Sequence, residues 1–141
     1  MNNNIKIFEN DIPPEIDLSK EKLIGVDCEA LGLTLGRDPL TLVQLGLASK
    51  NFYLVKLNRK TYEAPNLVKV LSNNSIEFIM HYSRQDLLWL KYHLKVKPLK
   101  IFDTKVASKL ARTMSNMHGY KDLVKELCGK DISKKEQQSD W

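Results

Sequence analysis

Two acidic residues lie two positions apart in the segment LIGVDCEALGL, residues 23–33. Asp27 directly follows the apolar run of residues 23–26, and Glu29 follows Cys28. Because side chains alternate between the faces of a strand, Asp27 and Glu29 point to the same side. Neighbouring carboxylates repel each other, and a divalent cation such as Mg²⁺ or Mn²⁺, which prefers oxygen ligands, relieves that repulsion. The pair indicates either a metal site or two solvated acids at an exposed strand end.

A third carboxylate, Asp86, lies in the segment HYSRQDLLWL, residues 81–90. Leucines recur there at helical spacing, which predicts a helix over 83–94 with Asp86 in its first turns. Its core face is expected to include Leu87, Leu88, Leu90 and Leu94, and core packing is also expected for Trp89 and Tyr92. An acid near a helix N-terminus is favoured by the helix dipole alone. Set beside Asp27 and Glu29, it is also a candidate third member of a cluster of oxygen ligands.

His81 ends the apolar segment just before Asp86. A histidine at the end of a strand, next to a cluster of acids, could contact a phosphate or order a water molecule. The alternative is a histidine that is hydrogen-bonded within the fold. No other histidine lies at a ligand spacing from it, so the sequence does not favour a zinc site.

Periodicity and turn signals predict the elements that position these side chains. We expect strands over 5–9, 23–27, 40–47, 52–57, 76–81 and 100–104, and helices over 64–73, 83–94, 104–113 and 118–129. An antiparallel meander followed by alternating helices and strands predicts an α/β fold, with a mixed sheet and helices on its faces. Because sites in open sheets form at the carboxyl ends of strands, the acids and His81 are expected to meet there.

Composition restricts the class of protein. The 141 residues, with 43% hydrophobic and 28% charged side chains, suit a single globular domain over 1–141. We expect no membrane segment, because no apolar run approaches the length of about 20 residues that spans a bilayer, and no signal peptide. The two cysteines, Cys28 and Cys128, have no metal-ligand spacing and suit a cytoplasmic protein. A net charge of +5 is compatible with a nucleic-acid partner.

Five segments resemble one family of nucleases. VDCEALGL, HYSRQDLLWL, FDTKVASKL, GYKDLV and SDW occur in the order typical of the ribonuclease D-like, DEDD-type 3′-5′ exonucleases. APNLVKVL, KVASKLART, HGYKDLVKELCG and ISKKEQQSDW resemble the nanoRNase C branch, whose members degrade very short oligoribonucleotides. Each motif is unspecific alone, but their order and spacing extend the resemblance over about 5–141 and favour the metal site over two solvated acids.

The resemblance implies a ribonuclease H-like fold and two-metal hydrolysis with Mg²⁺ or Mn²⁺. Asp27 would bridge both ions, Glu29 would bind one ion and help to hold the terminal 3′-OH, and Asp86 would hold the second ion. Leu33 matches a family leucine that wedges against the terminal bases; the alternative is a core leucine. RNA 3′ ends or short oligoribonucleotides are the implied substrates, 5′-mononucleotides are the implied products, and a homo-oligomer is the implied assembly.

One family motif is missing from the sequence. The fourth acid of this branch lies in a Tyr-x-x-x-Asp helix after the SDW segment, and here SDW ends at Trp141. We therefore expect a domain that is truncated at its C-terminus. Asp103 precedes a helical run and is predicted to cap it rather than to replace the missing ligand. The alternatives to an exoribonuclease are an inactive remnant that keeps the fold and binds RNA, and a protein-interaction domain.

Overall fold

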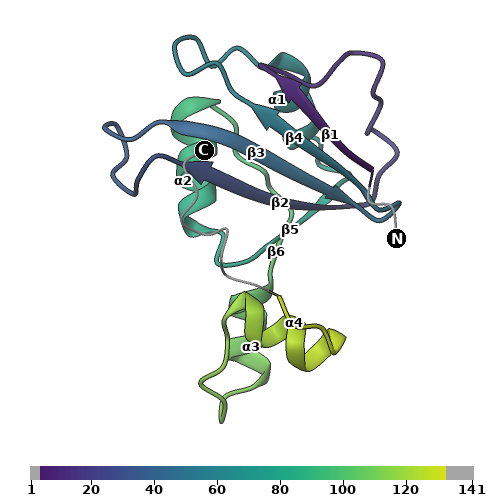
Figure 1. Ribbon diagram of the computed structural model, residues 1–141, viewed down its shortest axis with the longest axis vertical. Coiled ribbons are helices and arrows are strands. Elements are labelled where there is room, and N and C mark those ends of the chain that lie inside the picture. Colours follow the sequence, from purple (N-terminus) through teal and green to yellow (C-terminus); the bar gives the residue numbers. More distant parts are fainter. Residues whose placement is uncertain (1–3, 133–141) are drawn as a thin grey trace.

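The computed structural model describes residues 4–132 as a six-stranded sheet and four helices (Figure 1). The SDW segment and the remainder of the polar tail lie outside the described residues. In chain order the elements are β1 (Asn4–Glu9), β2 (Leu23–Ala30), β3 (Leu40–Leu47), β4 (Asn51–Lys56), α1 (Pro65–Leu71), β5 (Glu77–Met80), α2 (Arg84–His93), β6 (Ile101–Asp103), α3 (Thr104–Ala111) and α4 (Tyr120–Cys128).

The sheet is mixed, with the strand order β1-β4-β3-β2-β5-β6. Strands β2, β3 and β4 form the predicted antiparallel meander, and β5 and β6 continue the sheet parallel to β2. Strand β1 lies at the edge and pairs in parallel with β4. The expected α/β architecture is therefore confirmed. Strand β2 is central and three residues longer than predicted, so Glu29 as well as Asp27 lies within the strand.

One face of the sheet packs against α1 and α2 and forms the core. Val43 of β3 and Phe78 of β5 are almost completely buried there, together with Leu67 of α1 and Leu90 of α2. Helix α1 begins at Pro65, a residue suited to a first helical position because it has no N–H to leave unpaired. Both helices lie on the same side of the sheet in Figure 1.

The other face of the sheet carries the acid pair. Residues paired across neighbouring strands point to the same face, and one such row runs from Asp27 through Gln44 and Leu54 to Ile7. Towards the β1 edge this face is open, since Ile7 is 62% exposed and Ile5 is 58% exposed. The acids therefore point away from the side that α1 and α2 cover.

The core face of α2 differs from the predicted one. Leu90, Leu94 and Trp89 are buried as expected, but Leu88 is 39% exposed. Residues two apart on a helix point in nearly opposite directions, so Leu88 and Leu90 cannot both face the sheet. The assignment of Leu88 to the core was wrong, and so was that of Tyr92, which is 45% exposed.

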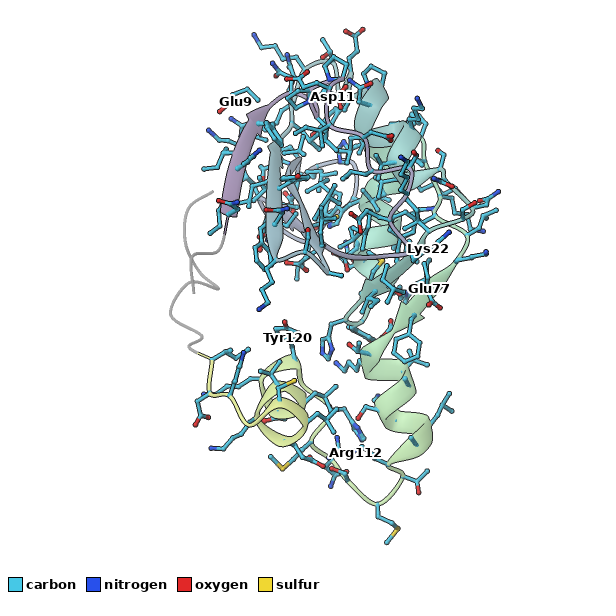
Figure 2. The ribbon with its side chains drawn as sticks, turned by 90° about the vertical axis from the view of Figure 1, so that its right-hand side faces the viewer. Glu9, Asp11, Lys22, Glu77, Arg112 and Tyr120 are labelled. Carbon is cyan, nitrogen blue, oxygen red and sulfur yellow. The ribbon has the colours of Figure 1, made fainter. Side chains whose placement is uncertain are left out.

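Helices α3 and α4 lie beyond β6, away from the main body of the sheet (Figures 1 and 2). Arg112, just after α3, forms an ion pair with Glu126 of α4, and a hydrogen bond of 2.9 Å joins Ser108 Oγ to His118 Nδ1. Helix α4 ends at Gly129, which adopts the left-handed conformation (φ 65°) expected of a C-terminal glycine. Among the described residues, no helix has the length and apolar character needed to cross a membrane.

Candidate active site

Asp27 and Glu29 converge on one nitrogen atom. The amide Nε2 of Gln44, on β3, lies 3.2 Å from Oδ2 of Asp27 and 3.3 Å from Oε1 of Glu29. The strand is fixed at this point because the hydroxyl of Thr41 donates to the carbonyl oxygen of Glu29 at 2.8 Å. The two carboxylates therefore point to the same side, as the alternation along the strand predicts.

Asp86 lies in the first turn of α2 and is joined to the same strand. Its Oδ1 accepts a hydrogen bond from the backbone N–H of Cys28 at 3.0 Å. Since Cys28 lies between Asp27 and Glu29, the structure brings all three predicted acids to one short segment of β2.

The pKa values of the three acids are all raised, because the carboxylates are partly buried and repel one another. Burial raises the pKa of Asp27, although part of its side chain remains exposed. Burial and then the charge of Asp27 raise the pKa of Glu29, and the same two causes raise the pKa of Asp86 to about 7. The pKa of the Cys28 thiol lies well above its usual value, because of burial and then the charges of Asp86 and Asp27. A cation placed here would be attracted by each carboxylate.

The donor set fits one hard divalent cation. Asp27 and Glu29 lie two positions apart on one face of β2, and Mg²⁺ is typically held by one or two carboxylates, with water and substrate phosphates completing its shell. Within residues 4–132, no three acidic, histidine or cysteine side chains are arranged as a complete metal-binding group. The described residues thus fit a single ion at the acid pair and do not by themselves form a two-ion site.

Leu33 is 81% exposed, so the interpretation as a core leucine is wrong. It lies in the loop of residues 31–39, which leaves β2 just after the acid pair and returns to β3. Asp38 organises this loop, because its carboxylate accepts a hydrogen bond from the N–H of Thr34 at 2.9 Å and pairs with Arg37 at 2.7 Å. The strands predicted over 23–27 and 40–47 leave these residues as a connection but do not reveal this role of Asp38.

His81 makes contacts within the fold. Its Nδ1 lies 2.9 Å from the hydroxyl of Thr104, which donates to the carbonyl oxygen of Met80 at 3.2 Å. The edge of the ring also packs against Tyr120, with 5.5 Å between ring centroids, and Figure 2 shows Tyr120 on the side of α4 nearest the sheet. Burial and the charge of Lys105 lower the pKa of His81. His81 therefore joins β5 to α3 and α4, as its hydrogen-bonded interpretation predicts.

Asp103 caps α3, as predicted, and does more. Its Oδ1 accepts hydrogen bonds from the N–H groups of Lys105 and Val106, at 2.9 and 3.0 Å. It also accepts from the N–H of Tyr82 at 3.1 Å and from the N–H and hydroxyl of Ser83 at 2.7 and 2.9 Å. These bonds bring the pKa of Asp103 down to about 2, against the opposing effect of burial. One carboxylate thus ties the start of α3 to the turn that precedes α2.

The order and pairing of the strands place the chain in a class of α/β proteins with a ribonuclease H-like exonuclease fold. A family model described as 3′-5′ exonuclease matches residues 15–141. The chain therefore belongs to this 3′-5′ exonuclease family, and the predicted relation to ribonuclease D-like enzymes is confirmed.

Three relatives illustrate the similarity. A ribonuclease D of Xanthomonas oryzae pv. oryzae is 29% identical over 132 residues, which cover 94% of this chain and 36% of the relative. A structure of Brucella melitensis NrnC with bound Mg²⁺ is 36% identical with a TM-score of 0.89, covering 98% of this chain and 66% of that chain. Escherichia coli RNase D, at 24% identity and a TM-score of 0.70, shares the fold; the match covers 87% of this chain and 32% of that chain. The chain thus spans about a third of the ribonuclease D relative and two thirds of NrnC.

Proposed function

We propose that the protein is a metal-dependent 3′-5′ exoribonuclease that hydrolyses phosphodiester bonds at RNA 3′ ends or in short oligoribonucleotides and releases 5′-mononucleotides. The observation that carries this proposal is the placement of Asp27 and Glu29 on one face of β2, where both accept from the amide of Gln44, with Asp86 bound to the backbone between them. Membership of the 3′-5′ exonuclease family supports it. The activity is proposed for the whole protein, because this chain spans about a third of the ribonuclease D relative and two thirds of NrnC.

In this proposal the three acids hold the metal. Asp27 and Glu29 would hold a first Mg²⁺ or Mn²⁺ ion, and Asp86 would contribute to a second ion directly or through water. The ions, when bound, would activate the attacking water and stabilise the leaving oxygen. An NrnC structure with Mg²⁺ among the relatives supports the choice of ion. Deprotonated acids are needed for this, so a metal ion has to compete with the proton on Asp86, whose pKa is about 7 without metal.

Leu33 and His81 are proposed to contact the substrate. The exposed leucine lies on the loop beside Glu29 and would stack on a terminal base, a contact that tolerates every base because each has an apolar face. His81 lies after β5, at the same end of the sheet, and would face a phosphate. Short oligonucleotides are the proposed substrates because an NrnC relative was solved bound to pGG.

The test is cleavage of a 5′-labelled oligoribonucleotide with Mg²⁺, with Mn²⁺ and with EDTA. We expect stepwise shortening from the 3′ end and release of 5′-mononucleotides in either metal, and none in EDTA. Asp27→Ala should lower the rate by a factor of about 100 or more. Asp17→Ala, which removes an exposed acid from the connector before β2, is the matched control. Equal rates for Asp27→Ala and the parent protein would refute the proposal.

We also propose a homo-oligomer in the cytoplasm built from one domain per chain. Exposed apolar side chains on α3 and α4, such as Leu110 at 76% and Leu127 at 70%, support self-association. Two free cysteines, Cys28 and Cys128, support a reducing compartment. One sheet with one continuous core supports a single domain. Sedimentation analysis of the parent protein and of Leu110→Glu tests the assembly, and a monomeric parent protein would exclude it.

A further inference from the structure

Gln44 of β3 contacts both members of the acid pair. In the antiparallel pairing of β2 and β3 it stands directly opposite Asp27 and therefore on the same face. Its NH₂ group has two hydrogens, and the two carboxylate oxygens at 3.2 and 3.3 Å can each accept one. The carboxylates also fix the orientation of the amide, because the opposite orientation would turn its carbonyl oxygen towards two anions.

The backbone that carries Gln44 is firmly anchored. Strand β3 lies between β2 and β4, and the neighbours Val43 and Leu45 are 0% and 1% exposed. The amide therefore projects from a part of the core that has little freedom to move. By contrast, the side chain of Glu29 has several rotatable bonds, and ordering such a side chain on binding costs free energy.

We propose that Gln44 is a positioning residue that holds Asp27 and Glu29 in the orientation in which they bind a divalent cation; this inference rests on the proposed metal-dependent function. A carboxylate has about four lone-pair sites, so an oxygen that accepts from the amide keeps further sites for an ion. The amide orders both carboxylates before the ion arrives. Without it, two mutually repelling carboxylates rotate apart, and ion binding has to bring them together again.

The proposal predicts weaker ion binding when the amide is removed. Partners that orient metal ligands typically contribute 10–100-fold, roughly, to metal affinity. We therefore expect Gln44→Met, which keeps an unbranched side chain of similar length without a donor, to raise the Kd for Mg²⁺ by about 10–100-fold. Raising the Mg²⁺ concentration should restore the kcat of the variant, because the amide acts through the ligands and not on the substrate.

The experiment measures Mg²⁺ binding to the full chain by isothermal titration calorimetry, alongside cleavage rates over a range of Mg²⁺ concentrations. Asn51→Leu is the matched control, because it removes an amide from the neighbouring strand β4 that bonds only to Ser49 within the described residues. Melting temperatures in EDTA establish that each variant folds. Gln44→Asn is the second variant if Gln44→Met does not fold, since its amide is one methylene too short to reach both carboxylates.

The outcomes separate the two proposals. A Kd raised about 10–100-fold in the Gln44 variant and unchanged in Asn51→Leu, with kcat restored at high Mg²⁺, supports the positioning role. An unchanged Kd, or tighter binding, in the Gln44 variant overturns it while leaving the proposed function intact. A parent protein that binds no Mg²⁺ overturns both the positioning role and the metal-dependent function. If added Mg²⁺ does not restore the cleavage rate of the Gln44 variant, Gln44 has a purely structural role and the positioning role is overturned.

Discussion

The backbone N–H of Cys28 donates a hydrogen bond to Oδ1 of Asp86 at 3.0 Å, across 58 residues of sequence. Strand β5 pairs with β2 only as far as Gly25 and ends at Met80, whereas β2 continues to Ala30. Beyond Gly25 the N–H groups on that side of β2 need another acceptor, since unpaired buried backbone groups are costly. Asp86 supplies this acceptor for the N–H of Cys28, and the hydrogen bond fixes the first turn of α2 beside the acid pair.

Asp86→Asn should stabilise the metal-free protein at high pH. The folded-state pKa of Asp86, about 7, lies above its ordinary value of 3.8, so the folded state binds this proton more tightly than the unfolded state does. The associated stability is complete below about pH 4 and is lost as the pH rises to 7. Asparagine keeps the acceptor for Cys28 and carries no charge, so we expect a gain on the order of 2 kcal/mol at pH 8.

Urea unfolding in EDTA at several pH values measures this difference. The two proteins should be equally stable near pH 4, and the gap should open between pH 4 and 7. Asp17→Asn, a change at an exposed acid, should give no gain at pH 8. A difference between Asp86→Asn and the parent protein that does not vary with pH would contradict the assigned repulsion.

Asp103→Ala should destabilise the protein, with its full effect above about pH 4. The loss of a helix cap costs about 0.5–2 kcal/mol, and we expect the upper end because Ser83 also loses its acceptor. The folded-state pKa of about 2 lies below the ordinary 3.8, so the advantage of the parent protein is complete above about pH 4 and diminishes as the pH falls towards 2. Thermal unfolding at pH 7, 4 and 2.5 measures it, and an equal advantage at all three would be evidence against a charged cap.

The sheet could be predicted from the sequence because its strands have distinct local patterns. The continuous apolar run before Asp27 predicts a strand, and the structure places it in the sheet between β3 and β5. Local patterns could not determine which side of α2 meets the sheet, because every residue from Leu87 to Leu90 is apolar. Burial of Trp89 in place of Leu88 is decided by packing against the strands.

The three acids could be predicted because each carries a local signal, either a spacing of two on a strand or a place in the first turn of a helix. Gln44 and Asp38 could not. The role of Gln44 depends on the register between β2 and β3, and that of Asp38 depends on the closure of a loop. Neither relation is periodic in sequence, so each becomes apparent only when the strands are paired.

Leu33→Ala should weaken substrate binding without affecting stability. The side chain is 81% exposed, so truncation should change the free energy of unfolding by less than about 0.5 kcal/mol. Stacking on one base contributes about 1–3 kcal/mol, which corresponds to a rise in KM of roughly 5–150-fold. Leu99→Ala, at a leucine that is 66% exposed and precedes β6, is the control. Equal KM values for the two variants would exclude the wedge.

Gly32→Ala should disturb the same loop through its backbone. Gly32 has φ +137°, and a Cβ atom there would lie 2.2 Å from Oδ2 of Asp38, the carboxylate that organises the loop. We expect a loss of about 1–3 kcal/mol in stability and a raised KM, because the loop has to shift and Leu33 shifts with it. Gly129→Ala, at another positive φ but with open space around it, should leave KM unchanged.

If Gly32 acts through Leu33, KM of the double variant Gly32→Ala/Leu33→Ala should equal that of Leu33→Ala alone. Additive effects on KM would show instead that the strained loop disturbs the acid pair directly.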